Sequence, residues 1–273
     1  MNCKPLFILF VLFVGCNSRQ PVSLTILHTN DTHSQVEPRE ADNRGGYARR
    51  MGLIEEERTL DKDLILLDAG DFCQGTPYFN YYEGEVEISA LNRMGYDAAT
   101  LGNHEFDNGV SKLADKLREA HFPIVCANYV VDATPLEGIV KPYVILKRKG
   151  LKIGVIGLGV NPESLVAAEN FAPLVWLPPF DIANTLAAEL KQKKHCDVVI
   201  CLSHLGTDVS HGDTAGICDI NLAKQSRDID VIIGGHTHRE VNRYVENAEG
   251  RQILLVQTGK SGLNLGKITL TVE

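Results

Sequence analysis

The sequence predicts a layered α/β domain, because short apolar strands alternate with helical stretches along almost the whole chain. Of the 273 residues, 44% are hydrophobic and 23% are charged, which is typical of a folded domain and excludes a largely disordered chain. No internal repeat, low-complexity segment or Pro/Gly-rich linker interrupts the alternation. We therefore expect residues 24–273 to form one domain.

The expected strands are short runs rich in apolar and β-branched residues. Lys149-Gly150 separates two of these runs and predicts a hairpin, so that some neighbouring strands should pair antiparallel. The expected strands are 24–27, 64–67, 98–101, 124–127, 143–146, 152–158, 198–202, 231–233, 253–256 and 267–272.

Four intervening segments have the spacing of amphipathic helices. In the first, apolar Leu53, Ile54 and Leu60 lie among Arg and Glu residues. The expected helices are 47–60, 110–120, 182–194 and 222–227.

The N-terminus predicts export. Lys4 is the only charged residue before the apolar run 6–14, which is too short to span a bilayer and has the length of a signal-peptide core. The run ends in Gly15-Cys16 and resembles a bacterial lipoprotein signal, although Phe13 stands where Leu is usual. An ordinary cleaved signal and a simple membrane anchor remain as alternatives.

The lipoprotein interpretation divides the N-terminus into a signal peptide, residues 1–15, and a tether, residues 16–23, with lipid on Cys16. All three alternatives place the domain outside the cytoplasm. We expect it in a bacterial cell envelope, on the periplasmic or cell-surface side. The formal net charge of −8 makes nucleic acid an improbable partner, because an acidic surface repels a phosphate backbone.

Five polar clusters each directly follow a predicted strand. Ligand sites in α/β sheets gather at the carboxyl ends of strands, so the clusters should converge in space. They are Asp31-Thr32-His33, Gly70-Asp71, Gly102-Asn103-His104-Glu105 with Asp107, Ser203-His204, and Gly234-Gly235-His236-Thr237-His238.

The side chains in these clusters are typical metal ligands. Two carboxylates, four neutral imidazoles and one amide oxygen would leave two divalent cations with about two uncompensated positive charges, which suits a phosphate dianion. Mixed nitrogen and oxygen ligation without thiolate favours zinc or manganese, with iron(II) as a further candidate. Asp71 could bridge both cations, and His104 would lie over the substrate.

Together the clusters resemble the motifs of the calcineurin-like metallophosphoesterases, and within them the 5′-nucleotidase branch. The matching segments are HTNDTHSQVEP at 28–38, GDFCQG at 70–75, GNHEFD at 102–107, SHLG at 203–206 and GGHTH at 234–238. They occur in the same order as in the family, and the resemblance extends from Leu24 to the end. It implies a metallophosphatase-type β-sandwich flanked by helices, a four-layer α/β/β/α fold.

The resemblance also implies a role for each matching residue. One metal would be bound by Asp31, His33 and His238, the other by Asn103, His204 and His236, with Asp71 bridging them. His104, paired with Asp107, would be catalytic. The alternatives are a structural role for His104 and an N-cap role for Asp107 at the helix that follows.

The implied activity is two-metal-dependent hydrolysis of phosphate esters. A 5′-nucleotidase-type phosphomonoesterase that uses a metal-activated water is the leading hypothesis. The alternatives are a 2′,3′-cyclic-nucleotide phosphodiesterase, a UDP-sugar hydrolase and, from another class, a non-catalytic metal-binding subunit of a surface complex. Extracellular 5′-nucleotidases usually continue into a second domain that stacks the base, whereas this sequence stops at Glu273. We therefore expect a separate polypeptide to supply base recognition.

Overall fold

A computed structural model of the chain describes residues 20–209 and 216–273. The signal peptide, Cys16 and residues 17–19 of the tether lie outside the described residues. Within the described part, no helix has both the length and the apolar character needed to cross a membrane.

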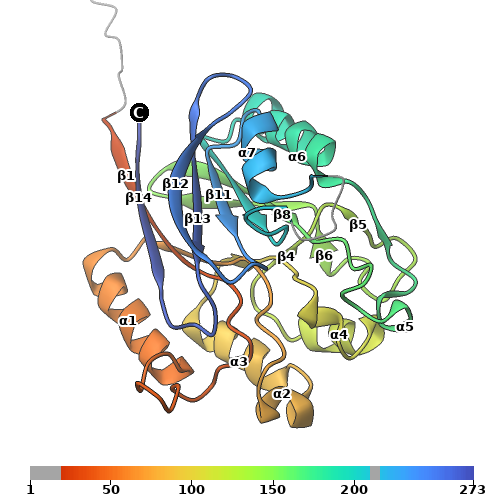
Figure 1. Cartoon of the computed structure of the whole chain (residues 1–273). Coiled ribbons are helices and arrows are strands. Elements are labelled where there is room, and N and C mark those ends of the chain that lie inside the picture. Colours follow the sequence, from red (N-terminus) through yellow and green to blue (C-terminus); the bar gives the residue numbers. More distant parts are fainter. Residues whose placement is uncertain (1–19, 210–215) are drawn as a thin grey trace, which may run out of the picture.

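Two six-stranded sheets form the centre of the fold (Figure 1). The first has the order β14-β1-β2-β3-β4-β6 and the second the order β12-β13-β11-β10-β8-β7. The first sheet consists of β1 (Val22–Thr29), β2 (Ile65–Asp68), β3 (Ala98–Ala99), β4 (Ile124–Val125), β6 (Val140–Lys141) and β14 (Gly266–Val272). The second consists of β7 (Tyr143–Arg148), β8 (Leu151–Leu158), β10 (Val198–Ser203), β11 (Val231–Gly234), β12 (Glu240–Glu246) and β13 (Gln252–Thr258). A separate pair is formed by β5 (Tyr129–Val130) and β9 (Val175–Trp176).

Helices cover the outer face of each sheet. In Figure 1, α1, α3 and α4 lie on one side of the strands and α6 and α7 on the other. The helices are α1 (Tyr47–Leu60), α2 (Pro77–Tyr82), α3 (Glu85–Met94), α4 (Val110–Leu117), α5 (Ala168–Phe171), α6 (Pro179–Ala188) and α7 (Asp219–Gln225), with a 3-10 turn at His104–Phe106 and a π-helical turn at Glu189–Lys193 after α6.

Alternation of side chains along the strands explains the layering. In β2, Ile65 and Leu67 pack into the core between the sheets, whereas Leu66 packs into the core beneath α1, α3 and α4. In β10, Ile200 faces the inner core and Cys201 faces the core beneath α6 and α7. Because both faces of each sheet are covered at its centre, central strands such as β2 and β10 are apolar on both sides. The predicted four-layer α/β/β/α fold is confirmed.

Parallel pairing brings the predicted clusters to one edge of the sandwich. Strands β1, β2 and β3 run parallel in the first sheet, and β10 and β11 run parallel in the second. Their carboxyl ends therefore point the same way within each sheet.

The hairpin predicted at Lys149-Gly150 joins β7 and β8, which pair antiparallel.

Several elements differ from the sequence prediction. Helices α2 and α3 and the strand β12 were not predicted, and α7 begins at Asp219 rather than at residue 222. A buried Glu87 breaks the apolar stripe of α3, and β12 is an edge strand with mostly exposed, polar side chains. Strand β1 begins at Val22, inside the predicted tether, because Val22 pairs with Val272 of β14.

His28 gives the fold a measurable pH dependence. Its side chain is 2% exposed, and its Nε2 lies 2.1 Å from where a Cβ on Gly266 would be. Burial lowers the pKa of His28 from 6.5 to about 4, so protonation favours the unfolded chain. The stability that this neutral imidazole contributes is complete above pH 6.5 and is lost as the pH falls towards 4.

Between pH 6.5 and pH 4, protonation of His28 should lower the free energy of unfolding of the wild type by roughly 3 kcal/mol, since one pKa unit corresponds to about 1.4 kcal/mol. We expect His28→Phe to lack this decrease. Urea unfolding of metal-free protein at a series of pH values measures this. The same substitution at the exposed His121 is the control. An unchanged pH dependence in His28→Phe would show that His28 does not carry this term.

Candidate metal centre

The structure brings the predicted ligands together in two groups that share Asp71. The first contains Asp31, His33, Asp71 and His238, and the second contains Asp71, His204 and His236. Within each group, one ligand atom from every residue lies within 4.8 Å of the others. The groups combine loops from both sheets, because Asp31 and Asp71 follow β1 and β2, whereas His204 and His236 follow β10 and β11.

Individual distances show how closely these atoms converge. Asp71 Oδ2 lies 3.1 Å from His204 Nε2, and His33 Nε2 lies 2.9 Å from His238 Nε2. Asn103, the amide predicted as a ligand, places Oδ1 3.1 Å from His236 Nδ1 and so joins the second group. The close approach of the His33 and His238 nitrogens is compatible with a hydrogen bond between the rings and also with both rings binding one cation.

Several ligand residues have a left-handed backbone conformation. The φ angles are 48° at Asp31, 46° at His33, 55° at Asp71 and 74° at His236. Such conformations cost on the order of 1–3 kcal/mol each for residues other than glycine, and they persist where the surrounding structure fixes them. Hydrogen bonds between the loops do so here: Asp31 N donates to Gly70 O at 2.9 Å, and His33 N donates to Asp71 O at 3.0 Å.

Gly102 leaves room for the shared carboxylate. A Cβ at this position would lie 2.1 Å from Asp71 Oδ1 and 2.7 Å from His204 Nε2. No side chain fits there while both groups keep their positions. The glycine in the predicted GNHEFD cluster therefore has a steric basis.

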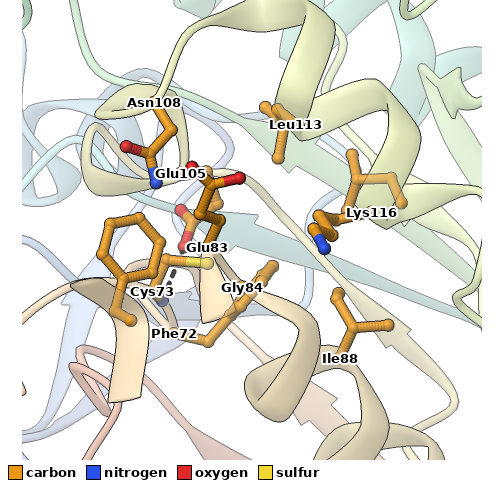
Figure 2. Close-up of a pocket in the computed structure, with 11 residues that line it drawn as sticks. Phe72, Cys73, Glu83, Gly84, Ile88, Glu105, Asn108, Leu113 and Lys116 are labelled. Carbon is orange, nitrogen blue, oxygen red and sulfur yellow. Dashed lines mark hydrogen bonds between the residues drawn. The ribbon is translucent and has the colours of Figure 1, made fainter. Parts of the chain in front are cut away.

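Glu105 fixes the backbone of two ligand loops. Its buried carboxylate accepts hydrogen bonds from the N–H groups of Asp71 at 3.0 Å, Cys73 at 3.0 Å and Gly102 at 2.6 Å. Figure 2 shows Glu105 beside Cys73, with the bond between them dashed. Burial, with the nearby charge of Asp71, raises the pKa of Glu105 to about 8. Glu105 therefore orients the loops and is not a member of either ligand group.

The electrostatics of the histidines suit a cation. His204 is fully buried, and its Nε2 makes no hydrogen bond of good geometry among the described residues, although it lies 3.1 Å from Asp71 Oδ2. Burial disfavours its charged form, but the carboxylates of Asp71 and Asp31 outweigh this and raise its pKa to about 10. The same negative potential would stabilise a bound cation, which would take the place of the proton on this ring. Burial lowers the pKa of His236 to about 4 and also lowers that of His33, so both favour the neutral, ligating form.

An orphaned ring nitrogen, two buried carboxylates and a cluster of imidazoles therefore fit bound divalent cations. Ala69 O lies 2.7 Å from Nδ1 of His204, which directs Nε2 of that ring at Asp71.

His104 and Asp107 form a pair at the open side of the centre. His104 Nδ1 lies 2.8 Å from Asp107 Oδ2, and the two side chains are 31% and 28% exposed. The hydrogen bond to Asp107 raises the pKa of His104, against the effect of burial. Helix α4 has Gly109 as its N-cap, with no side-chain cap, so the alternative N-cap role for Asp107 is not what the structure shows.

Two further residues of the centre were not identified from the sequence. Asn30 donates from Nδ2 to Asp31 Oδ2 at 2.5 Å, and its Oδ1 accepts from Thr258 N at 2.8 Å. Asp219, at the start of α7, accepts a hydrogen bond from Ser203 beneath His204. Asn30 lies within the first motif, but nothing in the local sequence connects Asp219 with the centre.

Family comparison agrees with this geometry. The signature of calcineurin-like phosphoesterases matches residues 24–240. The chain belongs to the calcineurin-like phosphoesterase family. Membership, together with the relatives below, makes it a metal-dependent phosphoesterase.

Several of the similar proteins are named as nucleotidases or nucleotide phosphoesterases. The chain is 34% identical to a 5′-nucleotidase of Diplobatis ommata over 93% of its own length and 46% of that protein. It is 31% identical to the trifunctional nucleotide phosphoesterase YfkN of Bacillus subtilis, over 92% of its length and 18% of that protein. The crystal structure of a 5′-nucleotidase precursor from Thermus thermophilus superimposes with a TM-score of 0.79 and 31% identity, covering 92% of this chain and 55% of that one. The chain thus spans about half the length, or less, of these relatives.

We expect Asp71→Asn to disturb both metal positions, because Asp71 belongs to both ligand groups. An amide keeps the shape but loses the negative charge that two cations share. Elemental analysis should find about two metal ions per wild-type chain and fewer in the variant. Asp115→Asn, at a side chain that is 74% exposed, is the control. Two retained ions with full activity would exclude a bridging role for Asp71.

Proposed function

We propose that this phosphoesterase is a two-metal-dependent phosphomonoesterase of the 5′-nucleotidase type, which releases phosphate and a nucleoside. The observation that carries the proposal is the pair of ligand groups sharing Asp71, with the His104–Asp107 pair beside them. The nucleotide substrate is inferred from relatives described as 5′-nucleotidases. Zinc and manganese are the proposed ions, with iron(II) as an alternative, because the ligands are nitrogen and oxygen atoms.

The chain contributes position and charge to the reaction. Divalent cations held by the two ligand groups would supply Lewis-acid activation of the phosphoryl group and of the attacking water. Glu105 and the loop hydrogen bonds hold the ligands in place, so that little reorganisation is needed during the reaction. His104 lies with its ring centroid 5.4 Å from that of the ligand His33, which places it at the edge of the centre.

His104 is proposed to stabilise the transition state or protonate the leaving oxygen. Asp107 orients its ring by accepting a hydrogen bond from Nδ1, which leaves Nε2 free to act on the substrate. The hydrogen bond also favours the protonated imidazolium, the form that can donate to a developing negative charge.

His104→Ala should lower kcat by on the order of 10²–10⁴, the range for losing a positioned acid or base. Metal content should barely change, because His104 is in neither ligand group. Steady-state kinetics and elemental analysis on the same preparation separate the two effects, with His121→Ala as the control. Loss of metal in His104→Ala would make His104 a ligand and overturn this division of roles.

A 2′,3′-cyclic-nucleotide phosphodiesterase and a UDP-sugar hydrolase remain alternatives. The trifunctional relative from Bacillus subtilis supports keeping them, because its name describes several nucleotide phosphoesterase activities in one protein. The metal centre interacts with the phosphorus centre, so the leaving group must be selected by other contacts. Remote contacts of this kind lower the barrier for one substrate over another.

We also propose that the domain is exported and anchored through lipid on Cys16, as the N-terminal sequence predicts. Base recognition would come from a separate exported polypeptide resembling the second half of the longer relatives. The support is that the chain matches 46% of the 5′-nucleotidase from Diplobatis ommata. Tethering both proteins to one membrane would raise their local concentration.

The isolated chain should hydrolyse an activated aryl phosphate and discriminate poorly between nucleotides that differ only in the base, such as AMP and UMP, because the metals bind the phosphate and not the base. The measurement is kcat/KM for AMP, UMP, 2′,3′-cyclic AMP, UDP-glucose and an aryl phosphate, with the metal-free chain as the control. Preference for phosphomonoesters over the cyclic and sugar nucleotides supports the proposed reaction. A strong preference for AMP by the monomeric chain would show that it recognises the base itself, and the partner proposal would fail.

A further inference from the structure

Arg50 is a buried cation without a carboxylate at hydrogen-bonding distance among the described residues. It lies on α1 and is 3% exposed, and its three guanidinium nitrogens make no hydrogen bond of good geometry in the described part of the chain, although the hydroxyl group of Tyr96 interacts with them. Its guanidinium carbon lies 5.3 Å from the ring centroid of Tyr47, a contact that offsets only part of the cost of burial. Burying an ionised group costs on the order of several kcal/mol. By contrast, the neighbouring Arg49 is exposed and donates a hydrogen bond to the backbone of Asn43.

The guanidinium packs against one segment beside the metal centre, and its positive charge acts on a buried carboxylate in a second segment. A Cβ on Gly262 would lie 1.8 Å from Arg50 Nη2, so the charged group lies directly against the backbone of Gly262. The second segment carries the buried carboxylate of Asp68. Burial raises the pKa of Asp68 to about 7, and the positive charge of Arg50 is one of the effects that oppose this.

Asp68 holds the loops that follow β1 and β2. Its Oδ2 accepts a hydrogen bond from Thr29 Oγ1 at 2.6 Å, and its Oδ1 accepts from Gly70 N at 2.9 Å. Gly70 directly precedes the shared ligand Asp71, and Thr29 lies two residues before the ligand Asp31. An ionised carboxylate accepts hydrogen bonds on both oxygens, so it is the form that suits both bonds as donated by Thr29 and Gly70.

The peptide of Asp31 is held from both sides by these segments. Its N–H donates to Gly70 O at 2.9 Å, and its carbonyl accepts from Ser261 N at 2.7 Å. Ser261 is next to Gly262, against which Arg50 packs. Asp31 has a φ of 48°, so its conformation depends on these anchors.

We propose that Arg50 is a positioning residue of the metal centre. Its guanidinium supports the backbone of Gly262, and its charge favours the ionised form of Asp68. The hydrogen bonds that hold the backbone of Asp31 from Gly70 and from Ser261 therefore keep their positions. Arg50 thus acts on the ligand Asp31 through Asp68 and Ser261. The inference rests on the proposed metal centre, and it gives a function to an otherwise costly buried charge.

The test is a titration of the metal-free protein with Mn²⁺. Arg50→Met keeps the volume and removes the charge, and should weaken Mn²⁺ binding by roughly 10–100-fold, the range for residues that support metal ligands. The thermal midpoint of the metal-free variant should stay equal or rise, because an unpaired buried charge is removed. Arg50→Lys keeps the charge and should recover most of the affinity. Arg49→Met is the matched control and should bind as wild type.

A second variant tests the same contact without removing the charge. Gly262→Ala must displace the guanidinium, whereas Gly250→Ala introduces similar backbone strain where no atom lies within 4 Å. Gly262→Ala should weaken Mn²⁺ binding and Gly250→Ala should not. This pair of variants decides the question if Arg50→Met does not fold.

Two results would overturn the proposal. The first is wild-type Mn²⁺ affinity in Arg50→Met or, where that variant does not fold, in Gly262→Ala. The second is a parallel loss of metal-free stability and affinity in Arg50→Met with no recovery in Arg50→Lys. The wild-type titration separately reports how many ions bind. A count below two would contradict the two-metal proposal, while the relative affinities of the variants would still decide the role of Arg50.

Discussion

The shared carboxylate of Asp71 is the constraint on which the rest of the structure depends. It is 1% exposed and belongs to both ligand groups, so it carries a negative charge into a region from which water is largely excluded. Such a charge is tolerated only where cations and hydrogen-bond donors surround it. The fold provides these from two sheets at once, since His104 N donates to Oδ1 at 2.9 Å and His204 Nε2 lies 3.1 Å from Oδ2.

The packed sandwich holds the loops that carry the ligand groups in fixed positions. Three parallel strands of one sheet and two of the other deliver their loops to the same edge, and apolar layers on both faces of each sheet fix their relative positions. The loops themselves are strained, as the left-handed conformations at Asp31, Asp71 and His236 show. Strain of this kind is tolerated because the strands beneath are well packed, and it directs several short side chains to one point.

Much of the fold, and the residues that the structure brings together in the two candidate ligand groups, were predictable from the sequence because both depend on local patterns. Apolar runs such as 152–158 mark buried strands, and polar residues directly after them mark strand ends. Helix α3 was missed because the buried Glu87 looks like a surface residue until its contact with Ser34 is known. The same limit applies to Arg50 and Asp219, since charged residues on helices are usually solvated and only the packing shows that these two are buried.

A phosphoesterase must bind a phosphoryl group, and it must select one phosphate ester over another. The candidate metal centre serves the first of these tasks and not the second. A compact group of carboxylates and imidazoles determines where a phosphoryl group can bind, and this requires little chain. Selecting one phosphate ester over another requires contacts several ångströms away, on the leaving group, and these contribute to catalysis only through binding energy that is realised in the transition state. The two ligand groups that share Asp71 provide for binding of the phosphoryl group. Substrate choice therefore depends on the surface that meets the leaving group, whether this chain or another supplies it, and can change without any change in the metal ligands.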